Sequence, residues 1–474
     1  MELEMQVSFE YAIKHLSTGA ARLYIQKSGI LRKFGFLAGL PYSSKHDKNN
    51  QKLEIELADH GNKHVMNIGR GELIELRNKQ TAETFAGVER VKVTFTKGKL
   101  VVSALKSHVA KTKRESRFKE AATGKRPFRS GSLFSGIATL AYRLKLGLKE
   151  QGIDSEITLS SDIDPLALSC QVDGNPIWEH ASSDALAYGG DIKELAQEDN
   201  LPWVDILEIG YPCKGMSTLC PSGRRDLNHP DVGGLFISLC RLIRKLQPSI
   251  LIFENSVPFL TSETLRLIKS ELTDYRWAST KITGHEFGDF EERPRSCVIA
   301  TSDGLPQLDL NAFQPRGNIS WEPISVILEQ IQDESPLWKE MHHVKRKLLD
   351  PKLNFKHKLY SGKETKIAAI PAGYNSPKIG SPMVAHPNYR NNGKQRLFTY
   401  TEHAKIRRLP SKLLSVLAQV ADGTYPLVSK RGNVTAVQSM LGNGVSPLPW
   451  SQLGAFIGEY INKHWRPSYA VTTK

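Results

Sequence analysis

The feature that most limits the possible folds of this chain is an alternation of apolar and amphipathic segments that begins at Ser132. Apolar runs of strand length lie at residues 132–135, 156–161, 204–209, 250–254, 278–283 and 297–301. Stretches with helical periodicity separate several of these runs, at residues 138–150, 235–246 and 263–272. Such alternation predicts an α/β fold with a Rossmann-like, doubly wound, mostly parallel sheet. The carboxyl ends of parallel strands share one edge, so we expect the functional site there.

The segments before this alternation differ from it in composition. Residues 1–105 contain several short candidate strands and a hairpin signal at residues 96–99, which predict a β-rich accessory domain. Their order of strands and turns resembles the AbrB-type swapped-hairpin domains, which bind DNA; a domain used only for packing is the alternative. Residues 106–130 are crowded with Lys and Arg and predict a flexible basic linker. Such a linker could contact a phosphate backbone or simply be solvated.

After residue 301 the alternation ends. Residues 302–430 are rich in Pro, Gly, Asn and basic residues, with interspersed Trp and Tyr, and predict a separate module. A turn followed by a helical stretch at residues 434–465 then completes the domain that residues 131–301 begin.

Charge and cysteine usage limit the class of protein. The net charge is +15 and the pI is about 9.4, which favours a polyanionic partner, nucleic acid before an anionic membrane. No apolar run approaches the ~20 residues of a membrane span, and no signal peptide is evident. The five cysteines are scattered and odd in number, which indicates a reducing, cytoplasmic setting. No Cys or His pair has zinc-ligand spacing, so we expect no metal; His342 and His343 are expected to be solvated.

Polar and glycine residues follow the first two predicted strands. Phe134 and Gly136 end the first strand, and Asp162 and Asp164 end the second, about twenty-six residues further on. A glycine lets a ligand approach the backbone at a helix start, and an acid at this offset can accept hydrogen bonds from ribose hydroxyls. The pattern therefore indicates a nucleoside-type cofactor. The alternatives are an ordinary glycine turn and capping of the helix that starts at Pro165.

Reactive side chains lie beside the later strands. Cys213 follows the strand at 204–209, Glu254 ends the next one, and Arg293 and Arg295 precede the strand at 297–301. These positions predict a thiol, a carboxylate and guanidinium groups at one sheet edge, next to the nucleoside pocket. By itself Cys213 could be an inert buried thiol, and the arginines could be a surface pair. Asn255 could cap a turn that holds the Pro212–Cys213 loop.

The ordered set of motifs resembles the cytosine-5 DNA methyltransferases over residues 131–465. The matching positions are Phe134-x-Gly136, Asp162 with Asp164, Gly190-Asp191-Ile192, Pro212-Cys213-x-x-x-Ser217, Glu254-Asn255, Arg293-x-Arg295, Arg396-x-x-Thr399-x-x-Glu402-x-Ala404 and Gly442-Asn443-Gly444-Val445. Each motif is weak alone, but their order is specific.

The resemblance implies an activity and a role for each residue. The methyl donor is expected to be S-adenosylmethionine, held by Phe134, Gly136, Asp162, Ile163, Asp191 and Asn443, with Asp184 as an alternative to Asp191. Cys213 is expected to add to carbon 6 of cytosine, and a protonated Glu254 to bind N3 and the exocyclic amine. Arg295 is expected to stabilise charge near O2, while Arg293 does the same or holds the loop. The target base must be flipped out of the double helix.

The same resemblance implies the partners and leaves alternatives open. Double-stranded DNA is the expected substrate, residues 302–430 the target-recognition domain, and a cognate restriction enzyme in a prokaryotic, phage or plasmid setting a possible companion. The chain departs from the family pattern at Ala138, Thr139, Lys214, Ser256 and Glu291. The altered glycine loop motivates an alternative, a catalytically inactive DNA-binding regulator. RNA cytosine-5 methylation is the other alternative.

Overall fold

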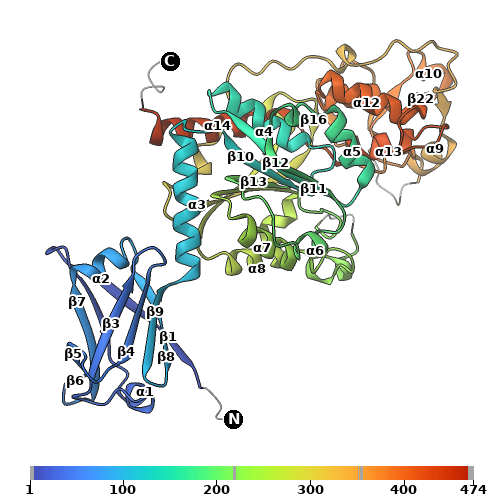
Figure 1. The fold of residues 1–474 in the computed structure, drawn as a ribbon. Helices are drawn as coiled ribbons and strands as arrows, with labels where there is room; N and C mark the ends of the chain where they lie inside the picture. The colour runs from blue at the N-terminus through green and yellow to red at the C-terminus, as the bar shows by residue number, and fades with distance from the viewer. Residues whose placement is uncertain (1–4, 217–219, 351, 353–355, 468–474) are drawn as a thin grey trace. The chain divides into compact units, whose positions relative to one another are not determined.

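The computed structural model describes residues 5–216, 220–350, 352 and 356–467. Ser217 of the predicted catalytic loop motif lies outside the described residues. The chain forms two compact units, residues Met1–Lys113 and Arg114–Lys474 (Figure 1).

The first unit is one antiparallel sheet with two short helices, α1 (Ser28–Lys33) and α2 (Lys79–Thr84). The sheet order is β5-β3-β4-β9-β8-β1-β2-β7-β6. Its strands are β1 (Val7–His15), β2 (Ala21–Ile25), β3 (Pro41–Asp47), β4 (Lys52–Leu57), β5 (Lys63–His64), β6 (Met66–Asn67), β7 (Glu72–Asn78), β8 (Arg90–Thr96) and β9 (Lys99–Ala104). The two edge strands, β5 and β6, are separated only by Val65, so the sheet closes on itself around an apolar core. The expected hairpin at residues 96–99 joins β8 to β9.

The second unit is built on a seven-stranded sheet of order β12-β11-β10-β13-β14-β17-β15. The first five strands are parallel, and β17 is antiparallel to both of its neighbours. The strands are β10 (Phe128–Leu133), β11 (Ser155–Asp162), β12 (Ala181–Gly189), β13 (Ile206–Ile209), β14 (Ile250–Asn255), β15 (Tyr275–Thr283) and β17 (Pro294–Ser302). The predicted α/β class is confirmed, and the carboxyl ends of five parallel strands share one edge.

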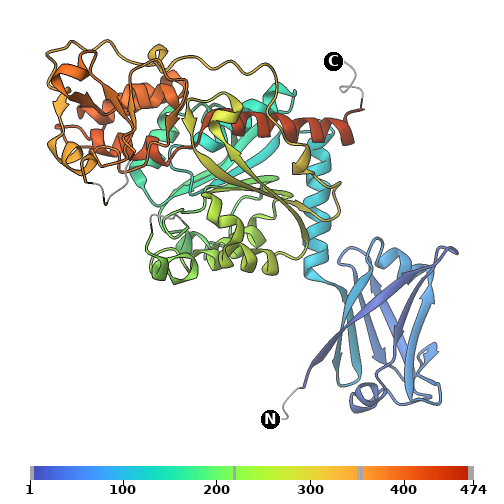
Figure 2. The ribbon, with the colours of Figure 1, turned by 180° about the vertical axis from the view of Figure 1, so that it is seen from behind.

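Helices cover both faces of this sheet. One face packs on α4 (Thr139–Glu150) and α14 (Pro447–Trp465), the other on α6 (Ile192–Leu195), α7 (Leu235–Leu246) and α8 (Glu263–Glu271). Figures 1 and 2 both show α14 beside α4. A Cβ on Gly147 would lie 1.9 Å from the Ser451 carbonyl oxygen, and one on Gly454 would lie 2.3 Å from that of Leu144. Glycine is therefore required where these two helix backbones meet.

The segment predicted to be a flexible basic linker is largely helical. Helix α3 spans Lys106–Ala122, and the boundary between the two units falls within it. Arg114 is buried and its Nη1 lies 2.8 Å from Asp274 Oδ2, while Arg126 Nη1 lies 2.6 Å from Asp205 Oδ2. Three guanidinium groups lie over the ring of Trp203, at 4.3 to 4.7 Å from its centroid, and belong to Arg117, Arg126 and Arg129. These arginines are thus occupied in packing rather than displayed to a phosphate backbone, which corrects the expectation for them.

A second, smaller sheet has the order β18-β22-β21-β19. Its strands are β18 (Lys339–Glu340), β19 (Leu359–Tyr360), β21 (Met383–Ala385) and β22 (Lys394–Arg396), and β16 (Glu291–Glu292) pairs separately with β20 (Ile367–Ala368). The remaining helices are α5 (Pro165–Gly174), α9 (His342–Leu348), α10 (Tyr389–Asn392), α11 (Tyr400–Ile406), α12 (Ser411–Asp422) and α13 (Val434–Asn443). Helix α5 packs against β11 and β12 of the main sheet and against α12. Short 3₁₀ turns lie at Pro176–His180, Ser222–Arg224, Asp226–Asn228, Val257–Thr261, Gly284–Phe287, Leu310–Ala312 and Ile324–Val326. In the described part of the chain, no helix combines the length and apolar character needed to cross a bilayer.

The central strand β13 carries a buried carboxyl group, Glu208. It lines a cavity of about 30 Å³ together with Ser130, Ser155 and Lys145. Neither of its carboxylate oxygens makes a hydrogen bond of normal geometry to any described residue. Burial raises the pKa of Glu208 from 4.5 to about 8, against an opposing contribution from Ser132. Glu208 is therefore protonated in the folded protein at neutral pH.

This burial predicts a specific pH dependence of stability. Between pH 4.5 and about 8 the unfolded Glu208 is ionised while the folded one keeps its proton. The free energy of unfolding should therefore fall by up to about 1.4 kcal/mol per pH unit as pH rises through this window. Urea unfolding of the wild type and of Glu208→Gln across the window measures this, and the variant should lack that component. Parallel pH profiles for the two proteins would contradict it.

Candidate active site

The loop after β10 has an unusual backbone that a carboxylate holds in place. Phe134, Gly136 and Ala138 all have positive φ, at 56°, 54° and 56°. The Gly136 N–H donates to Asp162 Oδ2 at 2.7 Å, and the Asp164 N–H donates to Asp162 Oδ1 at 2.8 Å. Burial raises the pKa of Asp162, and these backbone hydrogen bonds oppose the rise. Asp162 thus joins the end of β11 to the glycine loop.

Two buried amides that sequence reasoning missed brace the same loop. Gln171 Nε2 donates to Ser135 Oγ at 2.8 Å and to the Gly136 carbonyl at 2.9 Å. Asn175 Nδ2 donates to the Ile137 carbonyl at 2.9 Å. The available signal was a pair of amide side chains four positions apart, Gln171 within the helix that follows Pro165 and Asn175 at its end.

We predict that Gln171→Leu destabilises the protein by about 1 to 3 kcal/mol, because it leaves the Gly136 carbonyl and the hydroxyls of Ser135 and Ser160 without their buried partner. Chemical denaturation measures the loss. The matched control is Gln419→Leu, since Gln419 is exposed on α12 and should change stability by only about 0.5 kcal/mol. Equal effects of the two substitutions would count against a bracing role for Gln171.

The structure gives roles to the two departures from the family's glycine loop. Ala138 holds a left-handed backbone at the start of α4, where its side chain packs with Ile157 and Ile177. Left-handed backbone costs a non-glycine residue roughly 1 to 2 kcal/mol. The Thr139 hydroxyl accepts a hydrogen bond from the Val445 N–H at 3.3 Å. Thr139 thereby ties the start of α4 to the Gly442–Val445 segment.

The candidate cofactor residues that follow β11 and β12 differ in exposure and in the helices that they cap. Asp164 is exposed and caps α5 by accepting from the Leu166 N–H at 3.0 Å, so the capping alternative holds for Asp164. Ile163 lies between the two acids with 73% of its surface exposed. Asp191 follows β12, where the Gly190 N–H donates to the Asp162 carbonyl at 2.9 Å. Asp191 therefore lies at the shared carboxyl edge and also caps α6.

Asp184, the alternative to Asp191, lies away from this edge. It occupies the first half of β12, and both of its oxygens accept from Arg129 Nη2 at 2.6 Å. Hydrogen bonds from Arg129 hold the pKa of Asp184 below its ordinary value. Arg129 itself stands at the amino-terminal half of β10. These positions favour Asp191 over Asp184 as the candidate cofactor residue at the carboxyl edge of the parallel strands.

The loop with Cys213 is anchored to the neighbouring strand. Asn255, the last residue of β14, donates from Nδ2 to the Tyr211 carbonyl at 2.9 Å. The Tyr211 hydroxyl donates to the Val232 carbonyl at 3.1 Å, and its ring packs edge-on against Phe134 at 5.6 Å. Cys213 is exposed two residues further on. Asn255 thus holds the Pro212–Cys213 loop, and Phe134 joins this loop to the glycine loop.

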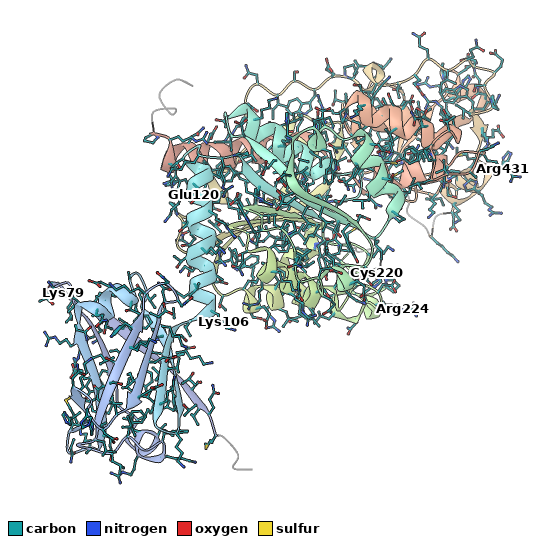
Figure 3. All side chains as sticks on the ribbon, in the orientation of Figure 1. Lys79, Lys106, Glu120, Cys220, Arg224 and Arg431 are labelled. Atoms are coloured by element: carbon teal, nitrogen blue, oxygen red, sulfur yellow. The ribbon has the colours of Figure 1, made fainter. Side chains whose placement is uncertain are left out.

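A carboxylate and a guanidinium meet beside that anchor. Arg295 Nε lies 2.7 Å from Glu254 Oε1, and the two side chains are 18% and 13% exposed. Glu254 directly precedes Asn255 on β14. The structure therefore brings the Cys213 loop, Glu254 and Arg295 to one edge of the sheet. Figure 3 shows Cys220 and Arg224, from the segment that follows Cys213, at the periphery of the unit.

Arg293 does not join the Glu254–Arg295 pair. It is buried, and its guanidinium donates to the Ile370 carbonyl at 3.0 Å and to the Gly442 carbonyl at 2.8 Å. These hydrogen bonds favour the alternative in which Arg293 holds chain segments together. A Cβ on Gly442 would lie 2.5 Å from the Ala372 nitrogen, so this junction also requires glycine. Asn443, next to it, is exposed at the end of α13.

Glu291 is the centre of the same buried junction. It forms an ion pair with Arg407, lies 3.6 Å from Arg293 and accepts from the Ile370 N–H at 2.7 Å. The Ser446 hydroxyl donates to it at 3.2 Å. Burial alone would raise the pKa of Glu291, but the two guanidinium groups hold it well below its ordinary value. Glu291, which stands where the family pattern has Gln, is therefore a charged buried anchor.

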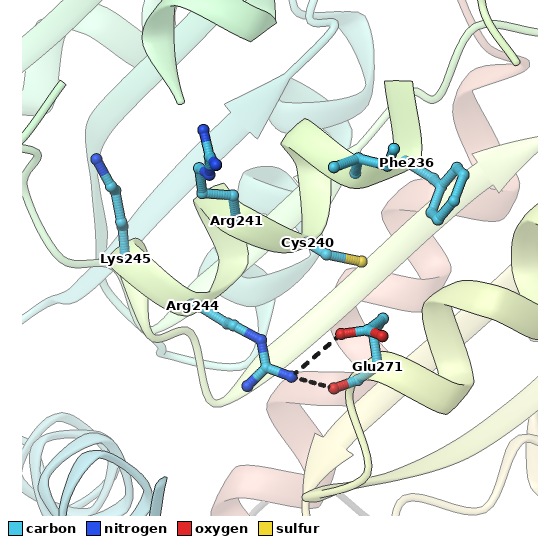
Figure 4. Close-up of a pocket in the computed structure, with 7 residues that line it drawn as sticks. Phe236, Cys240, Arg241, Arg244, Lys245 and Glu271 are labelled. Atoms are coloured by element: carbon cyan, nitrogen blue, oxygen red, sulfur yellow. Dashed lines mark hydrogen bonds and ion pairs between the residues drawn. The ribbon is translucent and has the colours of Figure 1, made fainter. Parts of the chain in front are cut away.

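A larger surface depression lies elsewhere and contains none of the predicted site residues. It measures about 490 Å³ and is formed by α7 and the end of α8 (Figure 4). Arg244, which lines it, is paired with Glu271, and Arg241 donates to Gln197. No cluster of three potential metal ligands occurs among the residues that the structure describes.

Comparisons with known proteins decide the family. The model of the C-5 cytosine-specific DNA methylase family matches residues 128–456. The chain belongs to this family. This confirms the resemblance drawn from the motif order, and members of the family use S-adenosylmethionine as methyl donor. No curated protein sequence matched the chain.

Solved structures agree on the fold of this family member. The Dnmt2 methyltransferase of S. pombe covers 71% of this chain and 100% of its own, at 17% identity and a TM-score of 0.51. The Entamoeba histolytica methyltransferase EhMeth covers 71% and 98%, at 17% identity and a TM-score of 0.50. At such identities the likeness establishes a methyltransferase fold and does not decide the substrate. The family assignment supports methylation of cytosine at carbon 5.

Proposed function

We propose that this protein transfers a methyl group to carbon 5 of cytosine within a specific sequence of double-stranded DNA. The observation that carries the proposal is the placement of an exposed thiol, Cys213, on a loop anchored beside the Glu254–Arg295 pair. Carbon 5 of cytosine is a weak nucleophile. A thiolate that adds at carbon 6 gives carbon 5 the electron density needed to accept a methyl group.

Each group at this edge has a task in that chemistry. Cys213 forms the bond to carbon 6 and is expelled once the proton on carbon 5 has left. Glu254 binds N3 and the exocyclic amine and supplies a proton as negative charge moves toward N3. Arg295 forms an ion pair with the Glu254 carboxylate through Nε, and its terminal guanidinium nitrogens can stabilise charge near O2. Because carbon 6 is inaccessible in a stacked duplex, the base must be flipped out first.

The glycine loop and its neighbours suit S-adenosylmethionine, which supplies the methyl group. Asp162, which accepts hydrogen bonds from two backbone N–H groups at the loop, is assigned to accept from the ribose hydroxyls as well. Ile163 offers an exposed apolar surface for the adenine ring, and Asp191 is an acceptor at the same edge. We assign Phe134, Gly136 and Asn443 to the remaining contacts.

We assign the other segments by the same reasoning. Residues 302–430 are proposed to recognise the target sequence, and residues 1–105 to bind DNA as well. A cognate restriction enzyme is a further proposal that depends on the sequence methylated.

Methyl transfer to defined nucleic acids tests the proposal. The purified chain is incubated with labelled S-adenosylmethionine and either unmethylated duplex DNA or folded RNA, and DNA products are sequenced after bisulfite treatment. Protected cytosines in one recurring DNA context are expected. Transfer to RNA alone would establish the RNA alternative. DNA binding without cofactor binding or transfer would establish the inactive regulator.

A further inference from the structure

Helix α9 (His342–Leu348) has two chemically different sides. Met341, Val344 and Leu348 recur at helical spacing and pack with Met383 and Leu359 of the small sheet and with Leu397, which follows β22. Val344 is 1% exposed and Met341 is 8% exposed. The apolar side therefore fixes the helix on a sheet, and Figure 1 shows α9 beside β22.

The other side of α9 is covered by cations. His342, His343, Lys345, Arg346 and Lys347 are all exposed, and the exposed Lys352, Lys356 and Lys358 follow within eleven residues of the helix end. Lys345, Arg346 and Lys347 make no ion pair with any described residue. Leu349 adds an apolar side chain that is 76% exposed. We call the outward residues Lys345, Arg346 and Lys347 the α9 cationic face.

This face differs from the other basic segment of the chain. Arg114, Arg126 and Arg129 of the segment 106–130 are neutralised by Asp274, Asp205 and Asp184. These three guanidinium groups therefore already have carboxylate partners within the protein. Three adjacent cations that have no acidic partner among the described residues, on a helix packed against the small sheet, match the closely spaced charges of a nucleic-acid backbone.

We propose that the α9 cationic face binds the phosphate backbone of duplex DNA. This inference rests on the proposed function, because the family and the proposed substrate make DNA the expected polyanionic partner. Binding to phosphates carries no sequence information and fixes the position of a protein on the duplex. The α9 cationic face thus positions the small sheet, whose other residues are free to read bases.

The test is the salt dependence of DNA binding by the full chain. The variant K345A/R346A/K347A is compared with K119A/K149A/K463A, which removes the same charge from exposed positions of the second unit outside residues 302–430. The slope of log K against log salt should decrease by about 0.9 for each phosphate that is no longer neutralised, so by about 2 to 3 in the α9 variant. The control variant should keep the wild-type slope. Thermal unfolding shows whether each variant remains folded, and a K345R/K347R variant, which keeps the charge, should bind as the wild type does.

The outcomes separate this inference from the proposed function. An unchanged slope in a folded α9 variant of a protein that methylates DNA overturns the inference and leaves the function standing. A reduced slope in a protein that methylates no cytosine supports phosphate binding by the α9 cationic face and overturns the function. A reduced slope on folded RNA but not on duplex DNA overturns the assignment of DNA as the partner.

Discussion

Replacing Cys213 by serine is expected to reduce methyl transfer by about 10⁴-fold or more. A hydroxyl remains protonated at neutral pH, and it is a much weaker nucleophile toward carbon 6 than a thiolate. Because Cys213 is exposed and the Asn255–Tyr211 bond that anchors its loop does not involve the thiol, the fold should be unaffected. The measurement is the single-turnover rate of methyl transfer to duplex DNA, with DNA affinity measured in parallel.

Cys220 provides a matched control for this substitution. It is in the same loop region, is partly exposed and donates from Sγ to the Arg224 carbonyl at 3.1 Å. Cys220→Ser keeps a donor at that position and should leave the rate within a few-fold of the wild type. Undiminished transfer by Cys213→Ser, or equal losses in the two variants, would show that Cys213 is not the nucleophile.

The second large effect is expected at Glu291, on stability rather than on chemistry. Glu291→Ala should lower the free energy of unfolding by about 3 to 5 kcal/mol, because it leaves the buried guanidinium groups of Arg407 and Arg293 without their counter-charge. The side chains of Glu291 and Arg407 are fully buried, so water cannot replace the missing partner. Glu291→Gln keeps the shape and some hydrogen bonds and should lose less. Denaturant unfolding measures both.

The neighbouring residue Glu292 is the control for Glu291. It is 55% exposed and its carboxylate lies 3.5 Å from Lys366, so Glu292→Ala should cost less than about 1 kcal/mol. The depressed pKa of Glu291 also fixes the sign of a pH effect. Its contribution to stability is present above the pKa of the unfolded state and is lost as pH falls below it. If the Glu291→Ala and Glu292→Ala variants had equal free energies of unfolding, the anchoring role of Glu291 would be contradicted.

The local pattern of the sequence was sufficient for the α/β class and for the family. Period and length separate strands from helices, and parallel strands bring their carboxyl ends to one edge. The predicted positions of Cys213, Glu254 and Asp162 at that edge needed only their places after strands. The likeness of residues 1–105 to AbrB-type domains and their role in binding DNA remain predictions.

What the local pattern could not supply was the partner of each polar side chain. Arg293 and Arg295 are two residues apart, yet Arg295 pairs with Glu254 and Arg293 binds Gly442, 149 residues further on. The basic segment 106–130 and helix α9 are alike in charge, yet within the described ranges only the first forms ion pairs with acids from distant segments of the chain. Such pairings depend on which segments the folded chain brings together, and burial then decides whether a charge holds the structure or stays available to a ligand. The sequence alone thus determined the fold class, the family and the edge that carries the site, while the tertiary structure decided which charged residues at and beyond that edge are anchors.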